Sequence, residues 1–253
     1  MNIFENLTTE GLEEATDRLG GPTLFDTDVY TGIVKLAYAG KSAGGAHSLT
    51  VLLDLDGTEY KEVLYVTDKK GNNWFPNKQD PKKKEQMMGF IVADDLALLT
   101  TGFPLANQTF EDKVVNIYDY EVKREVPTNV PVIVDMIGKE VSVAIERATE
   151  NKQAKDSSGV YQNTTETRDT NNIMKVYHAD TGRTVSEFKG QVNDPVHRDG
   201  WLARFKGKTR NKVKSVEGSS GLPGGAAKPT GSLFGGGATK SAGAASGLFG
   251  NKP

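Results

Sequence analysis

The chain has 253 residues, of which 36% are hydrophobic, with a formal net charge of −2 and no cysteine. This composition excludes disulfides and thiolate metal sites, and the three histidines are too scattered to form a ligand set. No segment approaches the roughly 20 apolar residues that span a bilayer, and no basic region followed by an apolar run marks export. The sequence therefore predicts a cytoplasmic protein with no membrane association, metal or cofactor.

The near-neutral net charge hides an uneven distribution. Residues 1–197 carry 21 Lys and Arg against 31 Asp and Glu, residues 198–217 carry 7 against 2, and residues 218–253 carry 3 against none. The densest basic run is Trp201–Lys214, which contains no acid. A basic end on an acidic body indicates a polyanionic partner.

The first predicted element is a short amphipathic helix over residues 8–19, where Leu and Ala recur at helical spacing. The period then changes to two, and residues 33–36 and 49–55 are predicted as strands. Asp56-Gly57 joins the second of these strands to another alternating run, residues 59–66. Two turn residues between alternating segments are the signal of a tight β-hairpin, which is predicted here.

The middle of the chain combines strands with one helix. A turn at residues 68–71 and a lysine-rich loop precede residues 85–99, which are predicted as a helix. Three further strand-like runs follow at residues 113–122, 130–134 and 140–146. Residues 150–172 are polar and offer almost no core-forming side chains, so they are predicted as a long loop or flexible arm. Short strands interrupted by one helix indicate a small, mostly β barrel.

The C-terminal third is predicted to contain a second hairpin, formed by residues 173–177 and 183–188, and a helix over Trp201–Lys214 despite Gly207. From residue 218 the chain is rich in Gly, Ala and Ser, which cannot bury enough apolar surface to offset the entropy of ordering. The predicted parts are an N-terminal helix and arm (residues 1–29), a β domain (residues 30–217) and a disordered tail (residues 218–253).

The tail contains a repeated motif, because Gly231-Ser-Leu-Phe-Gly235 recurs as Ser246-Gly-Leu-Phe-Gly250. One interpretation is chance recurrence in a biased segment. The other is a docking motif whose Leu and Phe enter an apolar pocket on a partner or on a neighbouring copy. The docking residues would be Leu233, Phe234, Leu248 and Phe249.

The sequence contains no convergent set of catalytic residues. Asp94-Asp95 is an acidic pair that could hold a magnesium ion for a nuclease, but no second pair at a suitable spacing supports this role. The alternative for these two carboxylates is a solvated helix face. The sequence therefore favours a protein that is not an enzyme.

Single-stranded nucleic acid is bound by cations along the backbone path and by aromatic faces under the bases. The chain interleaves both kinds of residue. The candidate DNA contacts are Lys69, Lys70, Trp74, Phe75, Lys82, Lys83, Lys84, Tyr118, Tyr120, Lys206, Lys208, Arg210, Lys212 and Lys214. The alternatives are core burial for the aromatic residues and a solubilising role for the basic run. Trp201 and Phe205, four residues apart, favour packing of a helix on the core over base stacking.

Four blocks of sequence, taken in their order along the chain, carry a resemblance to a known family: Tyr30–His47, Tyr65–Phe75, Val115–Thr128 and Gly207–Lys212. Together they resemble the single-stranded DNA-binding proteins of tailed bacteriophages, over most of residues 1–215. The resemblance implies an OB-type barrel. With the elements predicted above, the expected fold is an OB-like five-stranded barrel with an inserted helix, a short N-terminal helix, an extra hairpin and a C-terminal helix. The resemblance also implies coating of single-stranded DNA during phage replication and recombination in the host cytoplasm, and contact with replication proteins such as a polymerase or helicase-primase.

The resemblance assigns places to the candidate contacts. Lys69, Lys70, Trp74 and Phe75 would lie on a DNA-facing hairpin, Tyr118 and Tyr120 on the strand beside it, and Lys208, Arg210 and Lys212 on the basic terminal segment. Proteins of this functional class commonly end in an acidic tail, whereas this tail has no acid after Glu217, so partner recruitment would fall to the Leu-Phe-Gly motifs. Rival functions are a scaffold acting through those motifs and a metal-dependent nuclease, and self-association is left open.

Overall fold

The computed structural model describes residues 24–119, 121–157 and 159–216. The predicted N-terminal helix over residues 8–19 and the tail with its Leu-Phe-Gly motifs lie outside these ranges. Tyr120, one of the candidate base-stacking residues, also lies outside them.

Three antiparallel strands form the centre of the main sheet: β1 (Asp28–Lys41), β2 (His47–Leu55) and β3 (Thr58–Tyr65). Asp56 and Gly57 connect β2 to β3 with φ values of 52° and 80°. Two consecutive residues with positive φ match the twist of the flanking strands, which is why Asp-Gly is favoured at this turn. The predicted hairpin is confirmed.

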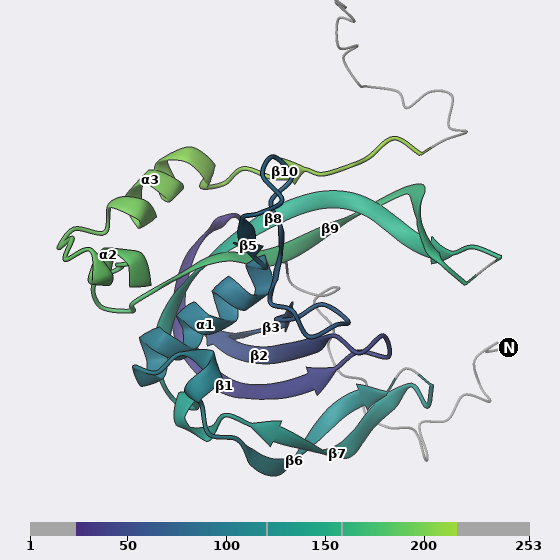
Figure 1. The fold of residues 1–253 in the computed structure, drawn as a ribbon, viewed down its shortest axis with the longest axis horizontal. Coiled ribbons are helices and arrows are strands. Elements are labelled where there is room, and N and C mark those ends of the chain that lie inside the picture. Colours follow the sequence, from purple (N-terminus) through teal and green to yellow (C-terminus); the bar gives the residue numbers. More distant parts are fainter. Residues whose placement is uncertain (1–23, 120, 158, 217–253) are drawn as a thin grey trace, which may run out of the picture. The chain divides into compact units, whose positions relative to one another are not determined.

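A short hairpin and a helix follow β3 (Figure 1). Strands β4 (Trp74–Pro76) and β5 (Lys84–Gln86) pair with each other, and α1 (Met88–Thr101) comes directly after them. The predicted helix is confirmed, but it begins three residues late because Glu85 and Gln86 pair in β5. Leu96 of α1 is fully buried in the core together with Val34, Leu53 and Ile145 of the sheet.

Two longer hairpins continue the sheet. Strand β6 (Glu111–Asp119) pairs with β7 (Arg124–Val132), and β7 contacts β1 where Val132 lies opposite Tyr38. Strand β8 (Glu140–Lys155) pairs with β1 along its first residues and with β9 (Tyr161–Tyr177) along most of its length. Two short 3₁₀ helices connect these elements, at Leu105–Asn107 and Val134–Met136.

The prediction of a loop over residues 150–172 was wrong, because these residues form the outer half of the β8–β9 ribbon. Most side chains of this segment are exposed or only half-buried. A ribbon with two solvated faces has no apolar alternation, although its backbones pair over most of its length, with an irregularity between Asn151 and Gln153. The outer parts of β8 and β9 could therefore not be recognised from alternating apolar and polar residues, because that alternation requires one buried face.

The C-terminal region differs from its prediction in two places. Residues 183–188 do not form a strand, and most of them lie in the short helix α2 (Val185–Lys189). This helix is set by a capping box in which the Glu187 backbone N–H donates to Thr184 Oγ1 at 3.1 Å and the Thr184 N–H donates to Glu187 Oε2 at 2.8 Å. The proposed second hairpin is therefore replaced by a helix with a sequence signal of its own.

The basic run is helical only at its start. Helix α3 (Val196–Phe205) ends at Phe205, and Gly207 has a φ of 71°, which ends helical continuation. The short strand β10 (Arg210–Asn211) then pairs in parallel with β8. Residues two apart in an extended chain face the same side, which is why Arg210 and Lys212 both reach one carboxylate, that of Glu146.

The fold is mostly β, as predicted, but the described strands do not close into a barrel. The main path of the sheet runs β10-β8-β1-β2-β3. Between β3 and β9 a side chain takes the place of a backbone ladder, because Glu62 Oε2 accepts hydrogen bonds from the Ile173 N–H at 2.8 Å and the Tyr60 hydroxyl at 2.6 Å. Within the described ranges, no helix is long and apolar enough to cross a membrane.

Candidate nucleic-acid interface

A groove of 480 Å³ lies along the edge of β3, where the sheet stays open. We call it the β3 groove. It is lined by Val63 and Tyr65 from β3, Phe75 from β4, Met88 from α1, Met174 from β9 and Lys212 from the C-terminal segment. Two of these residues, Phe75 and Lys212, are sequence-predicted DNA contacts that lie far apart in the sequence.

The start of α1 is held against β3 by a glycine. A Cβ atom on Gly89 would lie 2.3 Å from the carbonyl oxygen of Tyr65, a distance that no side chain can occupy. The absence of a side chain therefore lets the helix begin directly on the strand edge, which places Met88 in the wall of the β3 groove.

The β4–β5 hairpin presents its two aromatic residues differently. Phe75 is 43% exposed, whereas Trp74 is half-buried and has Lys84 Nζ 3.9 Å from its ring centroid. This cation–π contact covers one face of the indole, so Phe75 offers the more accessible ring. The lysines of the connecting loop, Lys82 and Lys83, are exposed.

Lys69 and Lys70 lie in the turn that leads into this hairpin, and both are exposed. The turn is held by Asp68, whose Oδ1 accepts from the backbone N–H groups of Lys70 at 2.8 Å and Asn72 at 2.9 Å. Gly71 has a φ of 86° in the same turn. The two lysines are thus carried on a defined turn rather than on an open loop.

The basic run is partly neutralised by acids of the body. Arg210 and Lys212 both pair with Glu146, at 3.2 Å and 2.7 Å, and Lys206 pairs with Asp28 at 2.8 Å. The Glu146 side chain is only 6% exposed. One carboxylate cannot neutralise two cations, so the pairing fixes Arg210 and Lys212 in place and leaves one positive charge in excess.

Two further lysines of the basic run, Lys208 and Lys214, are also held by contacts with the fold. Lys208 Nζ donates to the carbonyl of Arg204 at 2.6 Å, and Lys214 is tied by its backbone N–H to Asn151 Oδ1 at 2.7 Å. Lys212 and Lys214 also line a polar groove that includes Arg168. Lys212 and Lys214 therefore extend from the β3 groove to the outer part of β8, where Arg168 is paired with Glu150 at 3.0 Å.

A second hollow adjoins the β3 groove and shares Met88 and Met174 with it. Trp201 and Phe205 line this hollow beside Arg210, with their ring centroids 5.5 Å apart. The two residues lie together on α3 as their spacing indicates, but both are only half-buried and neither belongs to the buried core, so the predicted packing on the core is not observed. Their position beside the groove gives the interface a second aromatic surface that was not predicted.

Tyr118 lies apart from this site. It is 45% exposed on β6, and β6 pairs with β7 rather than with β4 or β5. Among the described residues that line the β3 groove, β6 contributes none. The expected position of Tyr118 on the strand beside the β4–β5 hairpin is therefore wrong.

Asp94 and Asp95, the acidic pair of α1, do not form a solvated helix face, which was the predicted alternative to a magnesium site. Asp95 is buried and pairs with Lys175, with 2.6 Å between Oδ2 and Nζ. Asp94 Oδ1 accepts the backbone N–H of Leu105 at 2.8 Å. Both carboxylates thus bind groups of the fold, and in the part of the chain that is described no three His, Asp or Glu side chains form a metal-binding group.

Sequence reasoning missed Tyr65 and Val63, which are 50% and 45% exposed in the groove. A signal was present. Tyr60 and Leu64 take the buried phase of β3, so Val63 and Tyr65 occupy its exposed phase. Large apolar residues on the outward phase of a strand indicate a surface with a partner.

Glu62 gives the wall of the groove a pH dependence. Burial raises the pKa of this carboxyl above its usual 4.5, although the hydrogen bonds from Tyr60 and Ile173 oppose the shift. The folded state therefore favours the protonated form, and the stability from this group is present below pH 4.5 and lost as pH rises through the raised pKa.

We expect the Glu62→Gln variant to gain stability relative to the wild type as pH rises. Glutamine retains an oxygen that can accept the Ile173 N–H, but it does not ionise. Urea unfolding of both proteins between about pH 4 and pH 8 measures the difference in free energy of unfolding. A difference that stays constant over this range would contradict the assignment.

No protein-family model matches the chain, and a search of curated proteins found no match. The candidate interface therefore rests on the residues and geometry of this chain alone.

Proposed function

We propose that the protein binds and protects single-stranded DNA without catalysing a reaction. The observation that carries this proposal is the meeting of Phe75 and Lys212 in one open groove. Single strands are held by stacking of bases on aromatic rings and by cations along the phosphate path, with little sequence preference. The β3 groove offers both kinds of contact, and Lys214 extends the cations beyond it toward the outer part of β8.

The order of elements supports an OB-like origin for this interface. In OB folds an open Greek-key barrel of five strands binds oligonucleotides on one face. Here β1, β2 and β3 form a meander, α1 follows, and β8 and β9 complete the set. We propose that the link from Glu62 to Ile173 takes the place of the final strand pairing. The role in phage replication and recombination, with a replication protein as partner, rests on the resemblance of the sequence blocks.

Tryptophan fluorescence tests the proposal, because Trp74 and Trp201 both lie at the candidate interface. A homopolymer oligonucleotide is expected to quench the emission, and salt is expected to reverse the effect. About five phosphate contacts would give a log–log salt slope of about −3.5. Absence of quenching would favour the scaffold, and magnesium-dependent cleavage of the oligonucleotide would favour the nuclease.

The Lys212→Gln variant tests the electrostatic part of the interface. Removing one phosphate contact is expected to reduce the salt slope by about 0.7 and to weaken binding similarly for different homopolymers. Lys113→Gln on β6 is the matched control, since Lys113 also pairs with a carboxylate, Glu111, at 2.7 Å. Equal slopes for Lys212→Gln and the wild type would remove Lys212 from the contact set.

A further inference from the structure

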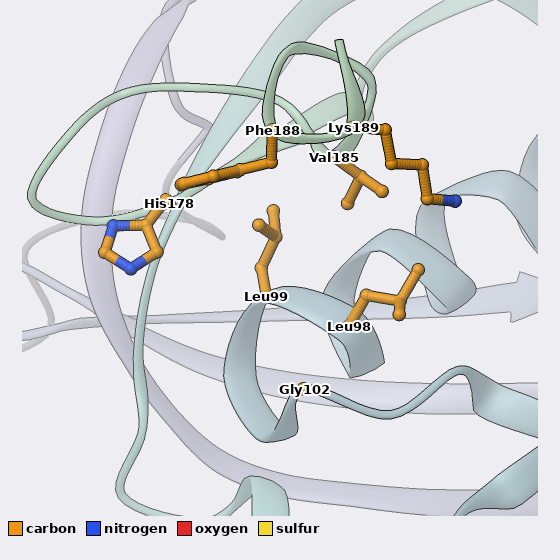
Figure 2. Close-up of a pocket in the computed structure, with 7 residues that line it drawn as sticks. All are labelled: Leu98, Leu99, Gly102, His178, Val185, Phe188 and Lys189. Atoms are coloured by element: carbon orange, nitrogen blue, oxygen red, sulfur yellow. The ribbon is translucent and has the colours of Figure 1, made fainter. Parts of the chain in front are cut away.

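An apolar pocket of 390 Å³ lies between the end of α1 and helix α2, in a different part of the molecule from the β3 groove (Figure 2). Leu98 and Leu99 line it from α1, and Val185 and Phe188 line it from α2. Figure 2 shows Leu99 and Phe188 extending toward each other from the two helices. Among the described residues that line the pocket there is no carboxylate, and the one ammonium belongs to Lys189.

The pocket is held open by its own walls. Gly102 ends α1 in the left-handed region, with a φ of 82° and its N–H on the Leu98 carbonyl, and contributes no side chain to fill the space. The Phe188 ring is fixed by the guanidinium of Arg183, 3.8 Å from its centroid, and by the edge of His178. The capping box of α2 sets the direction of that helix. A preformed apolar pocket of this size is typical of a binding site.

The chemistry of the pocket separates it from the nucleic-acid interface. It shares no lining residue with the β3 groove or with the hollow beside Trp201. A nucleic acid would bring phosphates, for which the walls offer only one cation. The walls instead suit a short peptide carrying one or two large apolar side chains.

The sequence of this chain contains such a peptide twice, as Gly-Ser-Leu-Phe-Gly at residues 231–235 and Ser-Gly-Leu-Phe-Gly at residues 246–250. Glycine on both sides of each motif adds no side chain beside the Leu and Phe that would enter the pocket. Residues 218–253 carry three lysines and no acid, whereas residues 1–197 carry an excess of ten negative charges, 31 against 21. The charges of the tail and the body are therefore complementary.

We propose that this pocket binds a Leu-Phe-Gly motif from the tail of a second copy of the chain. Leu233 follows Val216 by 17 residues, which span up to about 60 Å when extended. That reach is sufficient for a neighbouring molecule. A pocket on one copy and a motif on the next form a head-to-tail contact, which extends from copy to copy rather than closing after two. The contact does not depend on DNA and stands separately from the proposed function.

Complementation between two full-length variants tests the contact in the absence of DNA. The tail variant carries Leu233→Ser, Phe234→Ser, Leu248→Ser and Phe249→Ser, and the pocket variant carries Leu98→Lys. The wild type is expected to show a mass that rises with concentration in sedimentation, and each variant alone is expected to lose this association by at least tenfold. A mixture of the two variants is expected to form small complexes, because one supplies the motifs and the other the pocket.

Val114→Lys is the matched control for Leu98→Lys, since Val114 is a 71% exposed apolar residue on β6. It is expected to associate like the wild type. A wild type that stays monomeric at high micromolar concentration, or a mixture that sediments as two separate monomers, would overturn the proposal. Failure of the DNA titration would leave this result unchanged, so the two proposals can fail independently.

A cross-linking measurement avoids dependence on the folding of Leu98→Lys. A synthetic peptide of residues 228–240, with a photoreactive benzoylphenylalanine in place of Phe234, is added to the full-length tail variant and irradiated. Cross-links are expected in residues 98–102 and 185–189, and a peptide with Leu233→Ser is expected to lose most of them. Cross-links confined to the β3 groove, or spread evenly over the surface, would overturn the assignment of the pocket.

Discussion

Phe75→Ala is expected to weaken binding of single-stranded DNA by about 1–3 kcal/mol, because it removes an exposed aromatic ring of the β3 groove. This loss corresponds to a roughly 5- to 150-fold rise in Kd. Phe75→Leu, which keeps apolar bulk but no ring, is expected to recover little. Fluorescence titration with a homopolymer measures both variants, since Trp74 and Trp201 remain in place.

Phe103→Ala provides the matched control for this experiment. Phe103 is 61% exposed beyond the end of α1 and is not among the residues lining the β3 groove. Its removal is expected to leave affinity unchanged. A folded Phe75→Ala protein with wild-type affinity would show that the groove is not the stacking surface.

Gly32→Ala is expected to produce the largest loss of stability of any conservative change considered. Gly32 lies where β1 pairs with both β2 and β8, and a Cβ atom there would lie 2.0 Å from the carbonyl oxygen of Asp54. The neighbour is backbone, so it cannot move without breaking the ladder. We expect a loss of about 3 kcal/mol, which lowers the Tm by about 6–12 °C.

Gly200→Ala tests whether that loss reflects crowding rather than the loss of a glycine. Gly200 lies within α3, and a Cβ atom there would meet nothing within 4 Å. Alanine is expected to stabilise the protein by about 0.5–1 kcal/mol, because glycine is a poor helix former. Thermal unfolding of both variants therefore predicts shifts of opposite sign. Similar destabilisation by both would contradict the packing described around Gly32.

The elements predicted correctly from the sequence are those with one buried face and a clear boundary. The β2–β3 hairpin combined alternation with Asp56-Gly57, and α1 contained a long apolar run, although its predicted start was three residues too early. The outer β8–β9 ribbon lacked a buried face, and α2 was too short to show a helical period. Its capping box, Thr184 with Glu187, was the available signal and was overlooked.

The sequence predicted individual residues of the candidate site but not how the fold brings them together. The types of residue and their approximate positions were readable, since Phe75 and Lys212 stand in aromatic and basic segments. Their meeting in one groove depends on the parallel pairing of the C-terminal segment with β8, which no local pattern encodes. For the same reason Tyr118, with equally suitable chemistry, was placed beside them although β6 belongs to another hairpin.

Photo-cross-linking of a bromodeoxyuridine homopolymer to the full-length protein, followed by mass spectrometry, tests the central claim most directly. The account predicts cross-links to Phe75 and Tyr65 in the β3 groove, with further ones to Trp74 or Trp201, and their loss at high salt. Cross-links confined to Tyr118 and the β6–β7 hairpin, with none in the groove, would contradict it.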